Sequence, residues 1–512
     1  MQTELAIAHS ADIEDETLTR PAPAVEPRLV LVSNRVLNPS GKPSGGLAVG
    51  LSEALSAHDG LWFGWNGEIA SGAPSGEARE NVFEGFRTLT TDLSQAEHDE
   101  YYLGFANECL WPLLHYRTDL VQCRPSQERH YYAANRRLAG MLAAELAKND
   151  LVWVHDYHLI PFAEALREQG LSNRIGFFLH TPFPAPEIFA AAANHRRLGR
   201  ALFAYDLVAF QTNGDRDNFE RYAVRWLGAR RRPDGRLSLA GQVLQVADLP
   251  IGIDVADFAA HAQRHAHDDE IEGLMRACGD STLMVGVERL DYSKGLPERV
   301  AAFHHLLDSV PDMRGRIQYL QVATPTRSHV KAYEDIREAL DKAIGGVNGR
   351  FGTFAWEPVR YLNTPAQRPF LAGLFRRARV GLVTPLRDGM NLVAKEYVAA
   401  QDPEDPGVLV LSQFAGAAQQ MGAAVIVNPH NRFSIAEGIR QACEMSLEER
   451  KERHLLLLER ISREDVRWWR ESFIAALKDE SASRTGPYPV PDPRPADGVQ
   501  SPPSCAGEAR PG

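Results

Sequence analysis

Short apolar runs rich in β-branched residues recur along this chain, and most stop at a polar or glycine-containing turn that a helical pattern follows. The clearest example is residues 379–400, which read RVGLVTPLRDGMNLVAKEYVAA. Residues 380–384 suit a fully buried parallel strand, residues 387–389 form a turn signal, and Asn391 opens a helix. This order predicts an α/β fold with a parallel sheet, in which ligands bind beyond the carboxyl ends of the strands.

The strand and helix pattern comes in two blocks, and 512 residues are too many for one ordinary core. The strands predicted are residues 28–33, 151–154, 174–179 and 207–212 in the first block, and 282–287, 316–322, 380–384, 408–412 and 425–427 in the second. A Gly/Pro break at residues 250–254 separates the blocks. We therefore predict domains at 28–253 and 254–480, with disorder in the acidic, then Pro-rich residues 1–27 and in the Pro-rich tail 481–512.

Charge and cysteine usage exclude several classes of protein. The net charge of −11 argues against a general affinity for nucleic acid or anionic membranes. The five cysteines contain no CxxC pair, which predicts neither a disulfide framework nor a zinc site and suits a reducing cytosol. The first twenty residues lack the pattern of a secretory signal, and no apolar run approaches the ~18 residues that span a membrane. A cytoplasmic location is expected.

Polar side chains follow the predicted strands of both domains. Those at strand ends are Asp156 and His180 in the first domain, and Arg289, Lys294 and Asp388 in the second, while Glu396 lies on the first turns of the helix that follows. The two basic residues could neutralise a diphosphate, and the two carboxylates could accept hydrogen bonds from sugar hydroxyls. Taken singly, each could be structural, for example Asp388 as a helix cap. Their common placement at strand ends favours a binding site.

Other chemistries lack their sequence signatures. No G-x-G-x-x-G follows a strand, and the chain contains neither a Walker-type phosphate loop nor G-x-S-x-G. His155 and His158 stand three residues apart without a credible third ligand, so no metal site is predicted.

Many separate motifs resemble one family of sugar transferases. They include LVLVSNR, SGGLAVGL, VWVHDYHLIPFAEALR, IGFFLHTPFP, VERLDYSKGLPER and RDGMNLVAKEYVAAQDP, all between residues 28 and 478. Through them the chain resembles the trehalose-6-phosphate synthases, which are retaining nucleotide-sugar glycosyltransferases. The resemblance implies a GT-B fold, that is, two Rossmann-like doubly wound parallel-sheet domains facing a central cleft. It further implies that the final helical region crosses back onto the first domain.

The implied reaction transfers glucose from UDP-glucose to glucose 6-phosphate and yields α,α-trehalose 6-phosphate and UDP. Such an enzyme would serve trehalose biosynthesis and stress protection, would need no metal or other cofactor, and would form dimers or tetramers. Its expected mechanism is front-face transfer, in which the departing UDP phosphate takes the acceptor proton.

The resemblance also assigns residues to roles. Donor binding falls to Gly45, Gly46, Arg289, Lys294, Asp388, Met390, Asn391, Leu392, Val393, Ala394 and Glu396. Acceptor binding falls to Arg35, Tyr102, Trp111, Asp156 and Arg327. The expected catalytic residues are Arg289, Lys294, Asp156 and His180.

Three alternatives stay open at this point. The segment Tyr361-Leu-Asn363 continues with Thr364-Pro365-Ala366 where a comparable enzyme of the family has bulkier residues, so ADP- or GDP-glucose could replace UDP-glucose. Another acceptor, such as glycerol 3-phosphate, is a second alternative, against which the complete acceptor set argues. The third is a non-catalytic sugar-nucleotide-binding subunit, which should have lost some cleft charges, whereas every motif residue is present here.

Overall fold

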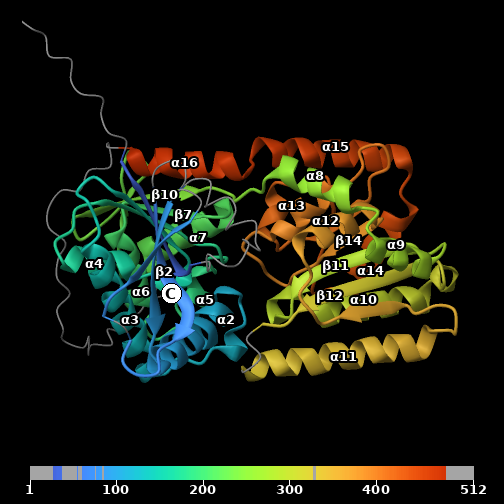
Figure 1. Ribbon diagram of the computed structural model, residues 1–512, viewed down its shortest axis with the longest axis horizontal. Coiled ribbons are helices and arrows are strands. Elements are labelled where there is room, and N and C mark those ends of the chain that lie inside the picture. Colours follow the sequence, from blue (N-terminus) through green and yellow to red (C-terminus); the bar gives the residue numbers. More distant parts are fainter. Residues whose placement is uncertain are drawn as a thin grey trace, which may run out of the picture.

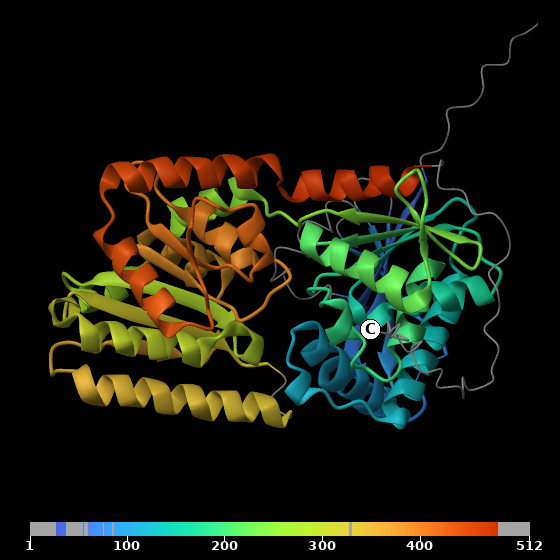
Figure 2. The same cartoon turned by 180° about the vertical axis from the view of Figure 1, so that it is seen from behind.

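The computed structural model describes residues 27–36, 55, 60–74, 76–83, 86–326 and 330–479. These residues form two α/β lobes that lie side by side, as Figures 1 and 2 show from opposite sides. The predicted helix at 47–55 lies outside the described residues apart from Leu55, and so do Gly45, Gly46 and Arg327.

The first lobe is built on a ten-stranded sheet in the order β3-β4-β2-β1-β5-β6-β7-β10-β9-β8. Its strands are β1 (Leu29–Arg35), β2 (Leu61–Ile69), β3 (Arg79–Phe83), β4 (Phe86–Leu93), β5 (Leu151–His155), β6 (Arg174–Phe178), β7 (Leu207–Phe210), β8 (Arg230–Arg231), β9 (Leu237–Leu239) and β10 (Gln242–Asp248). The seven strands from β4 to β10 along this order pair in parallel, and antiparallel strands flank them on both edges. The central strands are buried apolar runs because helices cover both faces.

The helical segments of the first lobe are η1 (Glu97–Leu110), α2 (Trp111–Leu114), η2 (Thr118–Leu120), α3 (Pro125–Ala143), η3 (Tyr157–Leu159), α4 (Phe162–Glu168), α5 (Pro186–Phe189), α6 (His195–Ala201), η4 (Leu202–Ala204), α7 (Asn213–Tyr222) and η5 (Ala223–Leu227). The first of these, η1, is a π-helix, and it runs directly into the short helix α2. Together they bring residues 97–114 along one face of the sheet toward the second lobe (Figure 1).

The second lobe is built on a six-stranded sheet whose strands all pair in parallel, in the order β13-β12-β11-β14-β15-β16. Its strands are β11 (Thr282–Arg289), β12 (Ile317–Thr324), β13 (Val359–Leu362), β14 (Val380–Val383), β15 (Val408–Ser412) and β16 (Val425–Val427). The helical segments are α8 (Val255–His265), α9 (Asp269–Cys278), η6 (Tyr292–Lys294), α10 (Leu296–Ser309), η7 (Pro311–Met313), α11 (Lys331–Phe351), α12 (Arg368–Arg377), α13 (Leu392–Ala400), η8 (Gly416–Gln419) and α14 (Arg432–Glu444). Two parallel sheets, each with helices on both faces, are the predicted fold, and that prediction is confirmed.

The last two helices, α15 (Leu447–Arg463) and α16 (Val466–Lys478), lie end to end along one side of both lobes (Figure 1). Helix α16 packs on the first lobe, where Phe473 stacks on Trp153 with ring centroids 4.1 Å apart. The Arg174 guanidinium of β6 also donates to the Leu477 carbonyl at 3.0 Å. One buried hydrophobic cluster therefore runs through both lobes and includes Trp153, Phe178 and Tyr397.

Two cysteines are bonded to each other, although the sequence predicted no disulfide framework. Cys109 at the end of η1 forms a disulfide with Cys123, which stands two residues before α3. Because the two lie fourteen positions apart without a CxxC pattern, their pairing depends on how η1 and α3 pack, which the spacing does not reveal. Cys278 and Cys443 are free.

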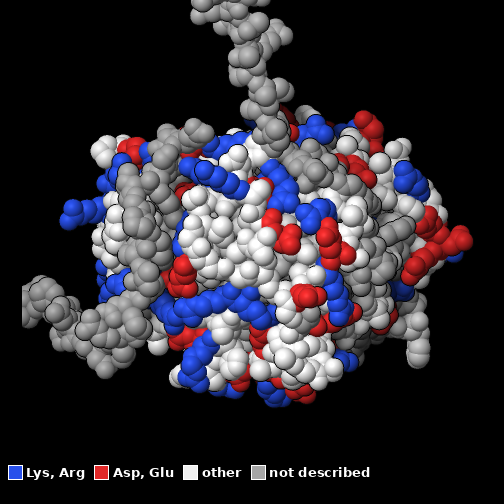
Figure 3. Space-filling view, turned by 60° about the vertical axis from the view of Figure 1, so that its left-hand side comes forward, with Lys and Arg blue, Asp and Glu red and all other residues white. Residues whose placement is uncertain are grey.

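Acidic and basic side chains intermingle on the face of the molecule seen in Figure 3. No helix among the described residues is long and apolar enough to cross a membrane.

Candidate active site

A buried charge cluster lies beyond the carboxyl ends of β11 and β14. Lys294, in the turn after β11, donates a hydrogen bond to the Asp388 carboxylate in the loop after β14. Its Nζ also lies 3.8 Å from the carboxylate of Glu288. The Asn391 amide joins both carboxylates, donating to Asp388 at 3.1 Å and to Glu288 at 3.3 Å. The arrangement holds one ammonium between two carboxylates, next to the start of α13.

The charges of this cluster depend on one another. Burial by itself would lower the pKa of Lys294, but Asp388 and Glu288 outweigh it and raise that pKa above the ordinary value. Burial raises the pKa of Glu288, although Lys294 and Arg299 oppose the shift. Lys294 therefore carries its full positive charge at neutral pH and can meet an anion once Asp388 has another partner.

Helix α13 presents its amino-terminal end to the same place. Its N-cap residue, Asn391, has a left-handed backbone with φ 72°, and the Oδ1 atom of Asn391 is buried without a partner among the described residues. Met390 and Ala394 are buried, whereas Leu392 and Val393 are half-buried. Free N–H groups at a helix start favour an anion. The predicted donor segment 390–394 thus lies at the amino-terminal end of α13, where an anion is favoured.

Glu396 lies one turn into α13 and is half-buried. Burial raises the pKa of its carboxyl to about 7, and Arg368 only partly opposes this. Hydrogen bonds from hydroxyl groups that replace water would stabilise the ionised carboxylate at this half-buried position.

The first lobe brings Asp156 and His180 together at the ends of β5 and β6. Asp156 has φ 75°, a conformation that costs free energy for a residue with a side chain. Its carboxylate accepts a hydrogen bond from the backbone N–H of His180 at 3.2 Å. The imidazoles of His155 and His180 contact through Nδ1 and Nε2 at 3.0 Å. Burial lowers the pKa of His180 to about 3, so this ring is neutral at physiological pH.

The two lobes touch at this point. A Cβ atom added to Gly389, next to Asp388, would overlap the backbone oxygen of His180. Only glycine lets the donor loop of the second lobe lie against the strand end of the first. Asp388 and His180 consequently lie close together where the two lobes meet.

Aromatic side chains complete the first-lobe side of the cleft. The Arg289 guanidinium lies over the Trp111 ring, 5.5 Å from its centroid. Tyr102, on η1, stacks on His158 at 5.8 Å. Arg35 is exposed at the end of β1 and lies over Trp65 at 5.7 Å. The structure thus joins Trp111 to a predicted donor residue and places Tyr102 and Arg35 around other first-lobe aromatics.

Three residues in this region were not predicted to have a role. Glu288 belongs to the quoted VERLDYSKG motif, and its place at a strand end beside Lys294 was a usable signal. Tyr116 and Arg387 contact each other across the cleft, and no local pattern indicates that. Within the described part of the chain, no group of three His, Cys, Asp or Glu residues is placed to hold a metal ion.

Comparison with known proteins identifies the family. Residues 32–479 match glycosyltransferase family 20. The chain belongs to this family. It is therefore a glycosyltransferase with the GT-B fold, and the family resemblance of the sequence motifs is confirmed.

Individual family-20 relatives cover most of the chain. The trehalose-6-phosphate synthase of Cronobacter sakazakii is 45% identical over 453 residues, which are 88% of this chain and 95% of that protein. A Burkholderia xenovorans α,α-trehalose-phosphate synthase (UDP-forming), solved in complex with glucose-6-phosphate, aligns with TM-score 0.84 and 44% identity, covering 88% of this chain and all of that one. A structure from E. coli bound with UDP-2-fluoro glucose aligns with TM-score 0.85 and 44% identity over 88% and 99% of the two chains.

Proposed function

We propose that this family-20 glycosyltransferase moves glucose from UDP-glucose to glucose 6-phosphate, giving α,α-trehalose 6-phosphate and UDP. The observation that carries the proposal is the meeting of predicted donor and acceptor residues from the two lobes. Arg289 of the second lobe lies over Trp111 of the first, and Gly389, next to the Lys294 partner Asp388, lies against the backbone of His180. The relatives support the choice of ligands, since they are trehalose-6-phosphate synthases and two were solved with a glucose phosphate or a UDP-glucose analogue.

In the proposed donor complex, the diphosphate lies against Arg289, Lys294 and the start of α13. Asp388 accepts hydrogen bonds from glucose hydroxyls, which frees Lys294 from its ion pair for the diphosphate. Glu396 accepts from the ribose hydroxyls. The family resemblance also assigns Gly45 and Gly46, which lie outside the described residues, to the diphosphate.

The acceptor lies on the first lobe. Arg35, Tyr102 and Trp111 of this lobe hold glucose 6-phosphate together with Arg327 of the second domain, and Asp156 accepts a hydrogen bond from its hydroxyls. His180 is neutral and contacts the transferred glucose without adding a charge.

Transfer then proceeds with retention of configuration. The bond from glucose C1 to the UDP oxygen breaks while the bond from C1 to the acceptor hydroxyl oxygen forms on the same face. The acceptor proton passes to the departing phosphate oxygen. Arg289 and Lys294 stabilise the negative charge that develops on UDP, which is the usual largest contribution to such catalysis. We propose that these two cations do this without a metal ion.

The test is UDP release from UDP-glucose, measured with and without glucose 6-phosphate and in the presence of a chelator. We expect release that depends on glucose 6-phosphate, survives the chelator and yields the α,α-linked product. Release only with ADP- or GDP-glucose would change the donor assignment. No release with any of these donors and several sugar phosphates would favour a sugar-nucleotide-binding subunit without catalysis.

A further inference from the structure

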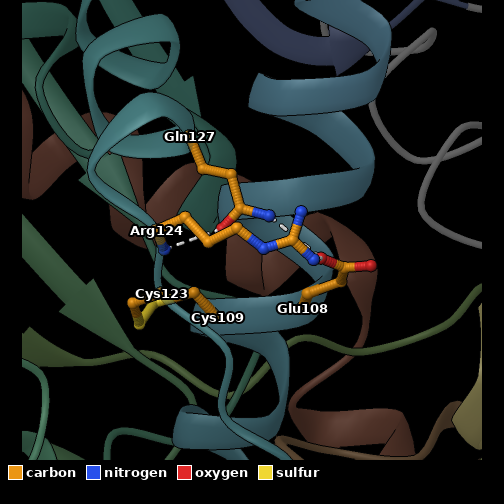
Figure 4. The surroundings of a disulfide bond; sticks show 5 residues. All are labelled: Glu108, Cys109, Cys123, Arg124 and Gln127. Atoms are coloured by element: carbon orange, nitrogen blue, oxygen red, sulfur yellow. Dashed lines mark hydrogen bonds and ion pairs between the residues drawn. A yellow bond between two sulfur atoms is a disulfide. The ribbon is translucent and has the colours of Figure 1, made fainter.

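The disulfide between Cys109 and Cys123 closes residues 109–123 into a ring, called the disulfide ring below (Figure 4). Cys109 is buried on η1, and Cys123 is exposed just before α3. Hydrogen bonds strengthen the junction, since the Gln122 N–H donates to the Glu108 carbonyl at 2.9 Å and the Gln127 amide donates to the Glu108 carboxylate at 2.9 Å. The ring is thus tied at its base to two helices of the first lobe.

Three side chains of the disulfide ring reach across to the second lobe, and each forms an arginine–aromatic contact. Trp111 lies under Arg289 at 5.5 Å, Tyr116 lies under Arg387 at 4.1 Å, and Arg117 lies over Tyr292 at 5.4 Å. Arg289 is the last residue of β11, Tyr292 lies in the loop after it, and Arg387 lies in the loop after β14. These loops also carry Lys294 and Asp388 of the buried charge cluster.

Tyr116 is the centre of these contacts. Its φ of 64° is a left-handed conformation that costs free energy for tyrosine. Its hydroxyl oxygen accepts two hydrogen bonds, one from the Arg387 guanidinium at 3.2 Å and one from the backbone N–H of Ala185 at 2.9 Å. Arg387 directly precedes Asp388, the ion-pair partner of Lys294. One first-lobe hydroxyl therefore joins the segment after β6 to the donor loop of the second lobe.

We propose that the disulfide ring is an interdomain clasp and that Tyr116 is its main positioning residue. The clasp sets the distance between an acceptor held on the first lobe and a sugar donor held on the second. The inference rests on the proposed transfer between the lobes. Misplacing reacting groups by about 1 Å can reduce a rate by roughly 10²-fold, so a contact that only aligns the lobes can still control turnover.

The first test substitutes Tyr116. Tyr116→Leu removes the hydroxyl and the ring beneath Arg387, and we expect kcat to fall about tenfold, the effect of losing one hydrogen bond and one cation–π contact. Tyr116→Phe keeps the ring, so its kcat should fall less than that of Tyr116→Leu. The dissociation constant for UDP should stay within about twofold, because Arg289 and Lys294 are unchanged. A structural defect would instead weaken UDP binding and turnover together.

Tyr132→Leu is the matched control. Arg197 lies over the Tyr132 ring at 3.5 Å, but both residues belong to the first lobe. This variant loses an arginine–tyrosine contact that does not cross the cleft. We expect a lower thermal midpoint with kcat within about twofold of the parent.

The second test opens the disulfide. Dithiothreitol supplies two electrons and two protons, so the S–S bond becomes two thiols while the reagent becomes a cyclic disulfide. Thiol titration of the denatured chain should find two more thiols after reduction, and kcat of the native enzyme should fall. Cys123→Ser should show the lower kcat without reductant and no further response. Cys443→Ser, which alters a free cysteine outside the ring, should respond as the parent does.

Several results would overturn the clasp: no gain of thiols on reduction, an unchanged kcat in Tyr116→Leu, or a parallel loss of UDP affinity. An inactive parent chain would contradict the proposed transfer instead. Small-angle X-ray scattering then still tests the clasp, because the radius of gyration should increase in Tyr116→Leu and after reduction but not in Tyr132→Leu. An unchanged radius in the first two would refute it.

Discussion

At the scale of single residues, substitution of the two arginines assigned to different substrates should change different kinetic parameters. Arg289→Ala removes charge that stabilises the leaving diphosphate, so kcat should fall about 10²–10³-fold. Arg35→Ala removes a phosphate contact of the acceptor, so the KM for glucose 6-phosphate should rise about tenfold with kcat nearly unchanged. Steady-state kinetics with both substrates varied would measure this. Equal changes in both parameters for both variants would contradict the assigned roles.

Glu396 should show a conflict between function and stability. Its pKa of about 7 lies above the ordinary 4.5, so above pH 7 the native state holds a buried charge that the unfolded chain exposes to water. Glu396→Gln at pH 8 should therefore raise the free energy of unfolding by up to about 3 kcal/mol. The same variant should raise the KM for UDP-glucose about tenfold, because an amide accepts ribose hydroxyls less strongly.

Denaturant unfolding and donor kinetics at pH 8 would check both effects. Glu437→Gln serves as the control, since Glu437 lies exposed on α14 beside Arg440 and should change neither quantity appreciably. A destabilised Glu396→Gln with normal donor KM would show that Glu396 has a structural role only.

At the scale of elements, the close approach of the donor loop to β6 should be intolerant of a single methyl group. Gly389→Ala would place a Cβ onto the His180 carbonyl, which is backbone and cannot turn away. The loop that carries Asp388 must then shift, and kcat should fall at least tenfold. Gly72→Ala, at a position with open space around it, should leave kcat unchanged. A fully active Gly389→Ala enzyme would mean that the lobes do not approach so closely during turnover.

The last helix illustrates how an element can unite two lobes. Helix α16 follows the second lobe in the chain but packs on the sheet of the first, where Trp469 lies against Trp153 with ring centroids 4.9 Å apart. A helix that crosses back in this way limits how far the lobes can separate. The clasp and α16 hold different sides of the same cleft.

At the scale of the whole molecule, buried neutral histidines should make the protein sensitive to acid. Burial lowers the pKa of His115 to about 4 and of His180 to about 3, against an ordinary 6.5. Asp291 and Asp388 oppose the shift at His115, whereas Lys294 adds to it. As pH falls below 6.5, the unfolded chain binds protons that the native state does not, so stability is lost. At pH 5 each histidine should cost about 2 kcal/mol relative to pH 7.

Unfolding midpoints between pH 7 and pH 4.5 would measure this loss. His115→Gln cannot be protonated and should show a shallower decline than the parent. Equal midpoints at pH 7 and pH 5, or an identical decline in the variant, would contradict the prediction.

Much of the architecture is encoded locally. The apolar run at 408–412 coincides with β15, and the predicted strand at 151–154 ends one residue short of β5. Buried parallel strands need continuous apolar residues, and the turns after them need glycine or short polar residues, so the order of the elements can be predicted from neighbours in the chain. The same order places Asp156 and His180 at strand ends of the first sheet, and Lys294 and Asp388 at strand ends of the second, because the carboxyl ends of parallel strands lie at one edge of each sheet.

The sequence by itself thus determined the fold class, with two parallel-sheet domains, and the family of the chain. Only the tertiary structure decided that Lys294 lies between Asp388 and Glu288, that Cys109 bonds to Cys123, and that Tyr116 meets Arg387. The physical reason is the separation along the sequence of the residues that interact. A strand or turn depends on residues a few positions apart, whereas Tyr116 and Arg387 stand 271 positions apart and meet only through the packing of one lobe against the other.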